Sequence, residues 1–343
     1  MKTWQLVMLG LILVSLVLFY FLKQRPRSQE IGKLFITLLS ELKDKEPDFI
    51  EAFSRNDDTS RLLLKREKHG WMIFVKQGNE GFWVPAKDQK VKKLLLDLSD
   101  FTGELRSSSR QYLEDFGLGT GQGLEIILKN SGKQISQIVV GKKGPSWGSC
   151  FVKRDDESKV YLVSRDLLAD FDIWTDKVQG PLEVRPWIDL NVLSLDPQDV
   201  ILCSYSKDDN SWSLKRSIQK DTKNSGTWIF IRDKKKEVIS HKKALKILGK
   251  LFPIHARDVA SANDLQKKMS SKDRGLFICK DNRGMMHSLS IVHCSKEEEL
   301  CLVKNEKGYV YKVDKKVVDE LRNPLTLKET AQHSGKEKSS HKR

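Results

Sequence analysis

The chain has few cysteines and lacks several of the short motifs that mark common enzyme classes. Five cysteines are spread over 343 residues without a CxxC pair, so their spacing predicts neither a disulfide framework nor a zinc ribbon. The HExxH motif and the phosphate-loop lysine motif are also absent. We therefore predict that the protein is not an enzyme and has no catalytic, cofactor-binding or metal site.

Charge is missing from one stretch near the N-terminus. No charged side chain lies between Thr3 and Leu22, and a helix of about 19 residues would be roughly 28 Å long, close to the ~30 Å hydrocarbon core. A cleaved signal peptide is the alternative, but LKQRPR follows the apolar run instead of a small-residue cleavage site. We predict an uncleaved transmembrane helix that contacts the bilayer through residues 3–22.

The net charge of +15 is spread unevenly along the chain. Residues 196–322 hold 27 Lys and Arg against 18 Asp and Glu, whereas the first 195 residues hold 29 against 26. This balance favours an anionic partner for the later part of the chain, although a lysine-rich solvated surface explains it equally well.

A long internal repeat indicates a duplicated domain. Asp48–Ser60 matches Asp199–Ser211 at a constant offset, with five of thirteen positions identical, and Gly123–Val140 matches Gly275–Val292 with seven of eighteen identical. Alternating apolar residues and turn signals within each copy predict strands. The expected fold class is α+β, an N-terminal transmembrane helix followed by two tandem repeats of a mostly antiparallel sheet with helices packed on it.

The predicted organisation has six parts. They are a membrane anchor at 1–27, an amphipathic connecting helix at 28–45, a first repeat at 46–175, a linker at 176–195, a second repeat at 196–322 and a disordered basic tail at 323–343. The connecting helix rests on a helical stripe of apolar residues, namely Ile31, Leu34, Phe35, Leu38, Leu39 and Leu42. We expect this stripe to pack against the first repeat, with the membrane surface as the alternative.

Several groups of residues resemble sites, and each has a structural alternative that we favour. The four glycines at 117, 119, 121 and 123 precede a predicted strand, whereas a phosphate loop requires a following helix. The pairs Asp57-Asp58 and Asp208-Asp209 lie between predicted strands, where aspartate commonly caps a turn. Calcium binding and acid–base chemistry are the alternatives for these pairs.

Two further groups of residues lie in the second repeat. The cysteines and histidines Cys279, His287, His293, Cys294 and Cys301 lack the short spacings of a metal site. The equivalent positions of Cys150 and Cys301 in the two repeats favour small buried side chains. The basic clusters at 234–236 and 241–243 lack an accompanying nucleic-acid-binding pattern, so we predict no nucleic-acid partner.

Paired tryptophans open equivalent apolar strands in the two repeats. Trp71 begins WMIFV and Trp228 begins WIFIR. A large aromatic at this point fills the space between sheet and helix. We predict that both belong to the core, with a surface platform that stacks on a sugar ring as the functional alternative.

Five segments of the first repeat resemble domain-of-unknown-function family 4340. These segments are WMIFV, PAKDQKVKKLLLDL, YLEDFGLGTGQGLEIIL, IVVGKKG and VYLV. The chain departs mildly from the family pattern, with Phe116 in place of a usual tyrosine and Lys87 in place of a usual aspartate. The resemblance implies a bacterial protein held by one N-terminal helix, with its domain outside the cytoplasm and its gene beside ABC transporters of the gliding-motility type. It implies no catalytic residues.

The expected function follows mainly from that resemblance. We predict a non-catalytic accessory or scaffold protein of an envelope ABC-transporter-like assembly, in the bacterial inner membrane. The alternative is a binding module for an anionic envelope polymer or lipid headgroup, which would use the basic second repeat. Lys23, Arg25 and Arg27 follow the span and, by the positive-inside rule, favour a cytoplasmic soluble part. The resemblance favours the opposite orientation, which we adopt.

Overall fold

The computed structural model describes most of the chain beyond residue 34. The described residues are 4, 14–15, 35–154, 157–208, 210–217, 227–268, 274–294 and 299–325. All but three residues of the predicted membrane span lie outside this set, as do the start of the predicted connecting helix and nearly all of the predicted tail. Within the described part, no helix combines the length and apolar character needed to cross a membrane.

The chain forms two compact units, each of which is described by itself. The first unit comprises residues up to 74 together with 85–188, and the second comprises 75–84 together with 189 onward. Residues 75–84 form the distal part of the β4–β5 hairpin, and in the second unit the Gln77 side-chain amide donates to the Val259 carbonyl (3.1 Å). The division therefore does not follow the repeat boundaries strictly.

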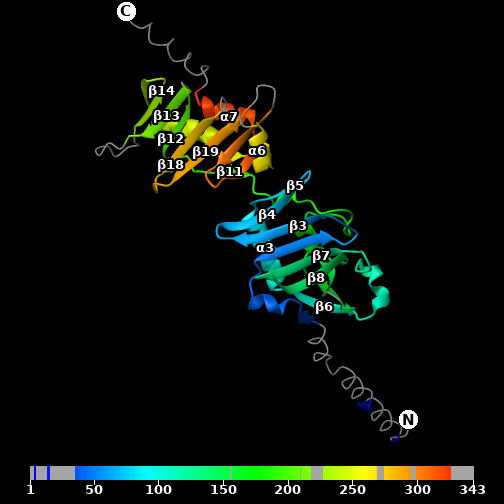
Figure 1. The fold of residues 1–343 in the computed structure, drawn as a ribbon. Helices are drawn as coiled ribbons and strands as arrows, with labels where there is room; N and C mark the ends of the chain where they lie inside the picture. Colours follow the sequence, from blue (N-terminus) through cyan, green and yellow to red (C-terminus); the bar gives the residue numbers. More distant parts are fainter. Residues whose placement is uncertain are drawn as a thin grey trace, which may run out of the picture. The chain divides into compact units, whose positions relative to one another are not determined.

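The first repeat contributes a ten-stranded, mostly antiparallel sheet (Figure 1). Its elements are β1 (Phe35–Thr37), η1 (Ser40–Lys43), β2 (Phe49–Ser54), β3 (Asp57–Glu67), β4 (Gly70–Gln77), β5 (Glu80–Pro85), α3 (Asp88–Ser99), β6 (Thr102–Ser107), η2 (Arg110–Tyr112), η3 (Glu114–Phe116), β7 (Leu124–Asn130), β8 (Lys133–Lys143), β9 (Cys150–Arg154), β10 (Val160–Val163), α4 (Leu167–Asp170) and η4 (Arg185–Trp187).

The second repeat contributes a nine-stranded antiparallel sheet and a short strand pair. Its elements are β11 (Asn191–Leu193), β12 (Val200–Lys207), β13 (Asn210–Arg216), β14 (Trp228–Arg232), β15 (Lys235–Ile239), α5 (His241–Leu251), β16 (Ile254–His255), β17 (Asp258–Ala260), α6 (Ala262–Lys268), β18 (Gly275–Asp281), β19 (Met286–His293), β20 (Leu300–Asn305), β21 (Val310–Asp314) and α7 (Lys315–Arg322).

The two sheets have the same strand order. The first runs β5-β4-β3-β2-β7-β8-β9-β10-β6-β1, and the second runs β15-β14-β13-β12-β18-β19-β20-β21-β17. Each strand of the second sheet has a counterpart at the same place in the first, and among the described strands β1 is the additional one. Helices α3 and α5 follow equivalent hairpins, as α4 and α7 follow equivalent strands. This correspondence is what a duplicated domain predicts.

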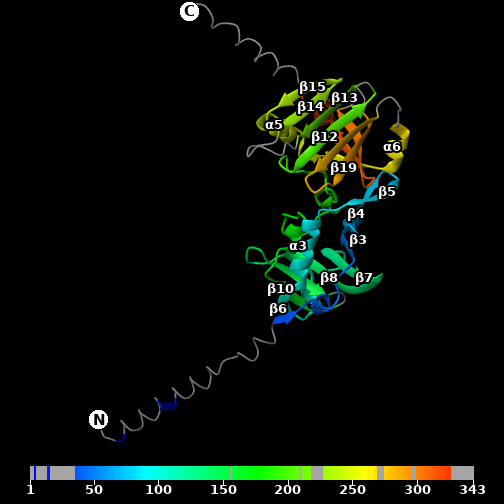
Figure 2. The same cartoon turned by 90° about the vertical axis from the view of Figure 1, so that its left-hand side faces the viewer.

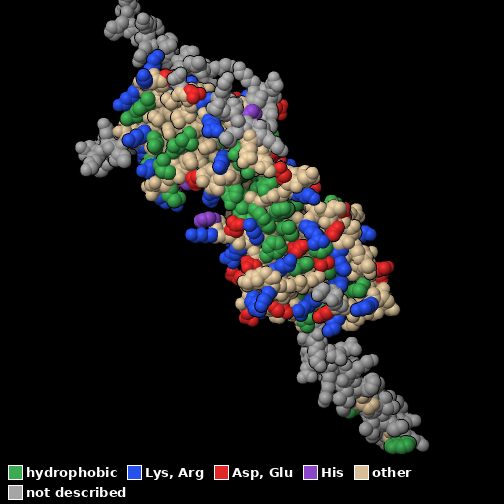
Figure 3. Space-filling model, viewed as in Figure 1, with side chains coloured by type: hydrophobic (Ala, Val, Ile, Leu, Met, Phe, Trp, Pro, Cys, Tyr) green, Lys and Arg blue, Asp and Glu red, His purple; other side chains and the backbone are tan. Residues whose placement is uncertain are grey.

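Helices cover one face of each sheet, and a short segment of the chain covers part of the other face. Alternating residues of β2 are buried, at Ile50, Ala52 and Ser54, as expected for a strand with one face in the core. On the opposite face of the second sheet, Leu265 of α6 packs against Leu302 of β20. Figure 2 shows α5 and α6 on opposite sides of this sheet. Charged side chains of both signs are scattered among hydrophobic and other side chains on the visible surface of both units (Figure 3).

The predicted amphipathic helix at 28–45 is wrong over the described residues 35–45. This segment forms strand β1, which pairs with β6, and then the 3₁₀ helix η1. The expected packing is nevertheless present, because Leu38 and Leu39 are fully buried. Apolar residues three and four apart are compatible with a helix, but they are equally compatible with the end of a strand followed by a tight turn. Pairing of β1 with β6 favours the strand and turn.

The predicted linker at 176–195 also needs correction. Residues 176–188 belong to the first unit. Trp187 is fully buried beside Phe171, with ring centroids 5.3 Å apart, and Leu182 is buried as well. The prolines and glycine that suggested a linker shape an irregular segment that packs on this unit.

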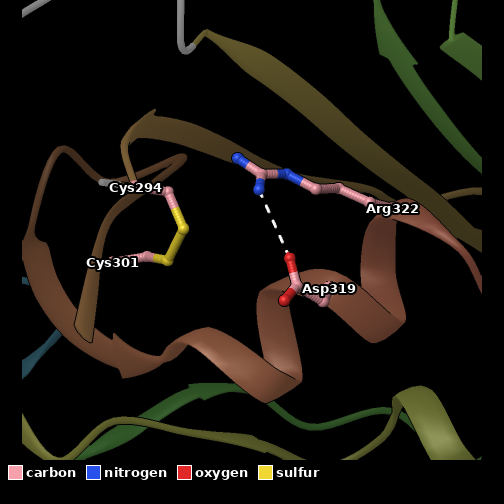
Figure 4. The surroundings of a disulfide bond; sticks show 4 residues. All are labelled: Cys294, Cys301, Asp319 and Arg322. Atoms are coloured by element: carbon pink, nitrogen blue, oxygen red, sulfur yellow. Dashed lines mark hydrogen bonds and ion pairs between the residues drawn. A yellow bond between two sulfur atoms is a disulfide. The ribbon is translucent and has the colours of Figure 1, made fainter. Parts of the chain in front are cut away.

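The prediction that the cysteines form no disulfides is wrong for four of the five. Cys203 and Cys279 are bonded across β12 and β18, where their Cα atoms are direct partners 4.2 Å apart. Cys294 and Cys301 form a second bond, with Cα atoms 4.3 Å apart. Figure 4 shows this bond beside α7, whose Asp319 and Arg322 form an ion pair (3.4 Å). Cys150 is free and buried.

Candidate functional site

The paired aspartates at 57 and 58 stabilise a turn and do not face each other as an acid–base pair. The Asp57 carboxylate accepts hydrogen bonds from the Thr59 hydroxyl (2.6 Å) and amide (3.1 Å), which lower the pKa of Asp57. Asp58 instead pairs with Arg61 (3.0 Å). In the second unit, Asp208 has a left-handed φ of 43°, as turn residues do, and Asp209 lies outside the described residues.

The glycine-rich segment at 117–123 is a loop that leads into a strand. Gly117, Gly121 and Gly123 have positive φ, and a Cβ atom at Gly123 would lie 2.8 Å from the Val140 carbonyl oxygen. Strand β7 begins at Leu124, so the loop leads into a strand and not into a helix. This arrangement lacks the strand-to-helix geometry that binds phosphate.

The cysteines and histidines of the group that resembles a metal site in the second unit have different local partners. Three of its cysteines are in disulfides, while His287 lies between two carboxylates. Its Nε2 is 3.9 Å from Asp281 Oδ2, and its Nδ1 is 3.7 Å from Glu306 Oε1. Among the described residues, no group of three or more potential ligands is placed to hold a metal ion.

Asp281 is a structural carboxylate at the turn between β18 and β19. Burial alone would raise the pKa of Asp281, but hydrogen bonds from the amides of Met285 (2.8 Å) and Arg283 (3.0 Å) to its Oδ1 outweigh that effect and lower it. The ionised carboxylate therefore holds the turn in place. This role explains its burial without a ligand.

The paired tryptophans belong to the core, as predicted. Trp71 is 4% exposed and Trp228 is 0% exposed. The indole N–H of Trp228 donates to Nδ1 of His241 (3.0 Å), which satisfies the one polar group of the buried ring. Neither ring is available for stacking on a sugar.

The sequence reasoning missed two tryptophans whose side chains lie on the surface of the first unit. Trp147 is fully exposed in the β8–β9 loop, and Trp174 is 71% exposed after α4. The loops that carry them are adjacent, because Lys143 Nζ donates to the Trp174 carbonyl (3.1 Å) and its amide donates to the Asp176 carbonyl (2.8 Å). Two tryptophans exposed on adjacent loops form a candidate contact surface, because tryptophan is enriched at protein interfaces.

An open groove of about 710 Å³ runs beside these loops, and we refer to it as the tryptophan groove. Trp174 and Gly148 line one part of it. The remaining wall comes from α3 and from the chain around α4, through Gln89, Lys90, Lys93, Asp97, Ser164, Arg165, Asp166, Ala169, Asp170 and Asp172. The groove therefore combines an exposed indole with many polar side chains.

Ion pairs hold the charged side chains of the groove in place. Lys93 contacts both Asp97 (2.9 Å) and Asp170, and Lys90 contacts Asp172. Burial raises the pKa of Asp170, which the ammonium of Lys93 opposes. Such a network offers fixed donors and acceptors to a partner and leaves little net charge.

The loop that carries Trp147 contains a GxSxG sequence, another feature that the sequence reasoning overlooked. It reads Gly144-Pro145-Ser146-Trp147-Gly148. In a hydrolase this motif forms a turn between a strand and a helix and is served by a histidine. Here it joins antiparallel strands β8 and β9, and the Ser146 hydroxyl donates to that of Ser149 (3.1 Å). The motif therefore acts as a hairpin loop that presents Trp147.

Comparisons with known proteins place the chain in a family. No curated protein and no solved structure matches it. Residues 79–272, more than half of the chain, match the model of the Domain of unknown function (DUF4340). The resemblance noted in the sequence is thus confirmed, and the chain belongs to the DUF4340 family.

Proposed function

We propose that this protein is a non-catalytic, membrane-anchored accessory or scaffold protein of the cell envelope, which holds a protein partner of the ABC-transporter type. The observation that carries the proposal is the pair of exposed tryptophans, Trp147 and Trp174, beside the tryptophan groove. Tryptophan is among the residues that contribute most to protein–protein binding, and a polar rim commonly surrounds the apolar centre of an interface.

The polar surroundings of the indoles favour one orientation of a bound partner. The charged side chains of the groove are paired with one another, as Lys93 is with Asp97 and Asp170, so they are already ordered before a partner binds. Ordered polar groups reduce the entropy lost on association. The indoles would supply most of the binding energy, and the ion pairs would set the orientation of the partner.

The cysteine pairs support an extracytoplasmic location for the soluble part. Cys203–Cys279 and Cys294–Cys301 are brought together by strand pairing and by a short connection between strands. Disulfides persist in oxidising compartments and are rare in the cytosol. They therefore favour the orientation that the family resemblance implies over the one that the basic residues after the span imply.

The docking proposal is tested by cross-linking in intact membranes. A photo-reactive residue in place of Gln89, within the groove, should trap a membrane protein partner. Combining it with Trp147→Ser and Trp174→Ser should reduce the yield at least tenfold, because each hot-spot residue contributes about 2 kcal/mol or more. Tyr112→Ser is the control, since Tyr112 is also an exposed aromatic of the first unit.

Two results would overturn the docking proposal. Equal loss in the Tyr112 variant would mean that the tryptophans have no special role. Retention of purified cell-wall glycan by the wild type, and not by the tryptophan variants, would identify the groove as a sugar-binding site.

Orientation is tested separately. A phosphatase fused after Arg343 should be active, and a fluorescent protein fused there should be dark, if the soluble part lies outside the cytoplasm. An inactive phosphatase and a bright fluorescent protein, together with labelling of all cysteines as free thiols, would show that the soluble part lies in the cytoplasm.

A further inference from the structure

One face of the second sheet carries lysine, serine and aliphatic side chains, and we refer to it as the open face. It is the face opposite α5 and α7, and three rows of direct strand partners cross it. The rows are Val238, Ile229, Lys215, Leu202, Lys280 and Met286; then Lys236, Ile231, Ser213, Ser204, Ile278 and Ser288; then Ser211, Ser206, Leu276, Ser290 and Lys304.

These three rows contain no aspartate or glutamate. Four lysines and six serines share the rows with seven apolar residues. Leu202 lies directly between Lys215 and Lys280, so two ammonium groups flank one aliphatic side chain. No carboxylate among the described residues lies within ion-pair distance of Lys215, Lys280 or Lys304.

The exposed apolar side chains of the second unit concentrate on the open face. Ile231, Val238, Leu276 and Met286 are between 38% and 64% exposed, and all four belong to the three rows. Among the described residues, the other large hydrophobic side chain exposed on this unit is Met285, which immediately precedes β19. Figure 3 shows hydrophobic and basic side chains interspersed on the visible face of this unit.

The equivalent face of the first unit neutralises its own charges. Glu51 of β2 pairs with Arg61 (2.7 Å) and Lys129 (3.0 Å), and Glu125 pairs with Arg55 (3.1 Å). Burial alone would raise the pKa of Glu51, but its bonds to Lys129 and Arg61 outweigh that effect and lower it. The two faces have thus diverged in charge although their strand order is the same.

The divergence replaces an acid by leucine and places a lysine on each side of it. At the offset of the internal repeat, Glu51 corresponds to Leu202. The direct strand partners of Glu51 are Leu63 and Ile127, whereas those of Leu202 are Lys215 and Lys280. Replacement of the carboxylate by leucine, with lysines in place of its two apolar neighbours, produces a surface that is both cationic and apolar.

A shallow groove of about 540 Å³ lies at one edge of the open face. Its wall includes Lys304 and Arg274 together with Leu276 and with Leu265 of α6. Asp208 is the acidic residue in the wall. The groove therefore repeats, in concave form, the mixture of cationic and aliphatic groups found across the rows.

We propose that the open face binds the surface of a lipid bilayer that contains anionic headgroups. Lysines and serine hydroxyls match phosphate oxygens, and each lysine near such a surface contributes to binding. The exposed aliphatic side chains match the acyl boundary beneath the headgroups, where interfacial protein segments bury their apolar residues. A soluble anionic polymer would satisfy the lysines but offers nothing to Leu276, Met286, Ile231 and Val238.

The test uses the full chain in a nanodisc of zwitterionic lipid, so that its predicted membrane anchor is already embedded in a bilayer. Liposomes of phosphatidylcholine alone, or mixed with phosphatidylglycerol, are then sedimented and the bound nanodiscs measured. The wild type should bind only the anionic liposomes, and binding should weaken with added salt. Lys215→Gln, Lys280→Gln and Lys304→Gln together should weaken binding on the order of a hundredfold, at about fivefold per lysine.

A charge-matched control separates the open face from net charge. Lys242→Gln, Lys246→Gln and Lys250→Gln remove the same charge from α5 on the opposite side of the sheet, and this variant should bind normally. Equal loss in the two triple variants would overturn the proposal, as would failure of the wild type to bind. Unchanged thermal unfolding of both variants shows that they are folded.

An apolar variant separates a bilayer from a soluble polymer. Leu276→Ser with Met286→Ser should weaken liposome binding while all lysines remain. If that variant binds normally and soluble polyphosphate displaces the wild type from liposomes, the surface recognises an anionic polymer and the bilayer proposal is wrong.

Discussion

Replacing Trp228 by alanine should destabilise the second unit by about 3–5 kcal/mol. The ring is 0% exposed, lies against His241 with ring centroids 6.4 Å apart, and donates its N–H to Nδ1 of that histidine. A buried tryptophan removes roughly 200 Å² from water, which at about 25 cal/mol per Å² corresponds to about 5 kcal/mol as an upper estimate.

A smaller change divides this cost into its two sources. Trp228→Phe keeps most of the apolar ring and removes the hydrogen bond, so it should cost about 1–2 kcal/mol. If His241→Ala is combined with Trp228→Phe, the total loss of stability should be smaller than the sum of the two single losses. Either change alone already removes the hydrogen bond between the two side chains. The mutant cycle measures the energy of the Trp228–His241 contact.

The assay must distinguish the two compact units. Hydrogen exchange during urea unfolding of the full chain can follow peptides from β14 and from β3 separately. Trp228→Ala should lower the urea midpoint of the β14 peptide and leave that of β3 unchanged. The control is Trp174→Ala, which removes an exposed ring and should change stability by no more than about 0.5 kcal/mol. A cost for Trp174→Ala equal to that of Trp228→Ala would refute the reasoning from burial.

Three further predictions concern titratable and bonded groups. Asp281→Asn should lower the melting temperature of the second unit at neutral pH. Because folding lowers the pKa of Asp281, its ionised carboxylate stabilises the fold at neutral pH and loses this effect as the pH falls below about 4 through the folded pKa. The difference in melting temperature between variant and wild type should therefore shrink over that range. Burial raises the pKa of Cys150 to about 12, so its thiol should resist maleimide at pH ~8 until the first unit is unfolded, as mass spectrometry can show. Reduction of the Cys203–Cys279 bond, which closes a 76-residue separation, should cost the second unit about 4 kcal/mol and leave exchange in the first unit unchanged.

Features that depend on local pattern could be predicted from the sequence. Asp57 and Thr59 form a turn because a short acceptor side chain can reach an amide two residues on, and this needs no distant partner. Trp71 and Trp228 open runs of β-forming apolar residues, and such runs are buried wherever a sheet has a covered face. The internal repeat predicted a shared strand order, because equivalent patterns fold by the same pairing rules.

The connecting segment shows where local pattern became ambiguous. The spacing of Leu38, Leu39 and Leu42 fits one face of a helix, and these leucines are buried as that face would be. Pairing of β1 with β6 decided the backbone conformation. The strand partners lie between 65 residues apart (Thr37 and Thr102) and 69 residues apart (Phe35 and Glu104). A periodicity of three or four residues cannot reveal a partner at such a distance.

The sequence by itself determined the duplication, the α+β class, the buried tryptophans and the turn roles of the aspartates, because each depends on residues close together in the chain or on similarity between the copies. Tertiary structure alone decided which cysteines meet, since Cys203 and Cys279 become partners only through the register of β12 and β18. It also decided that Trp147 and Trp174 lie on adjacent loops at the surface. The open face of the second unit likewise needed the register of seven strands, because a row of side chains across a sheet has no counterpart in the order of the chain.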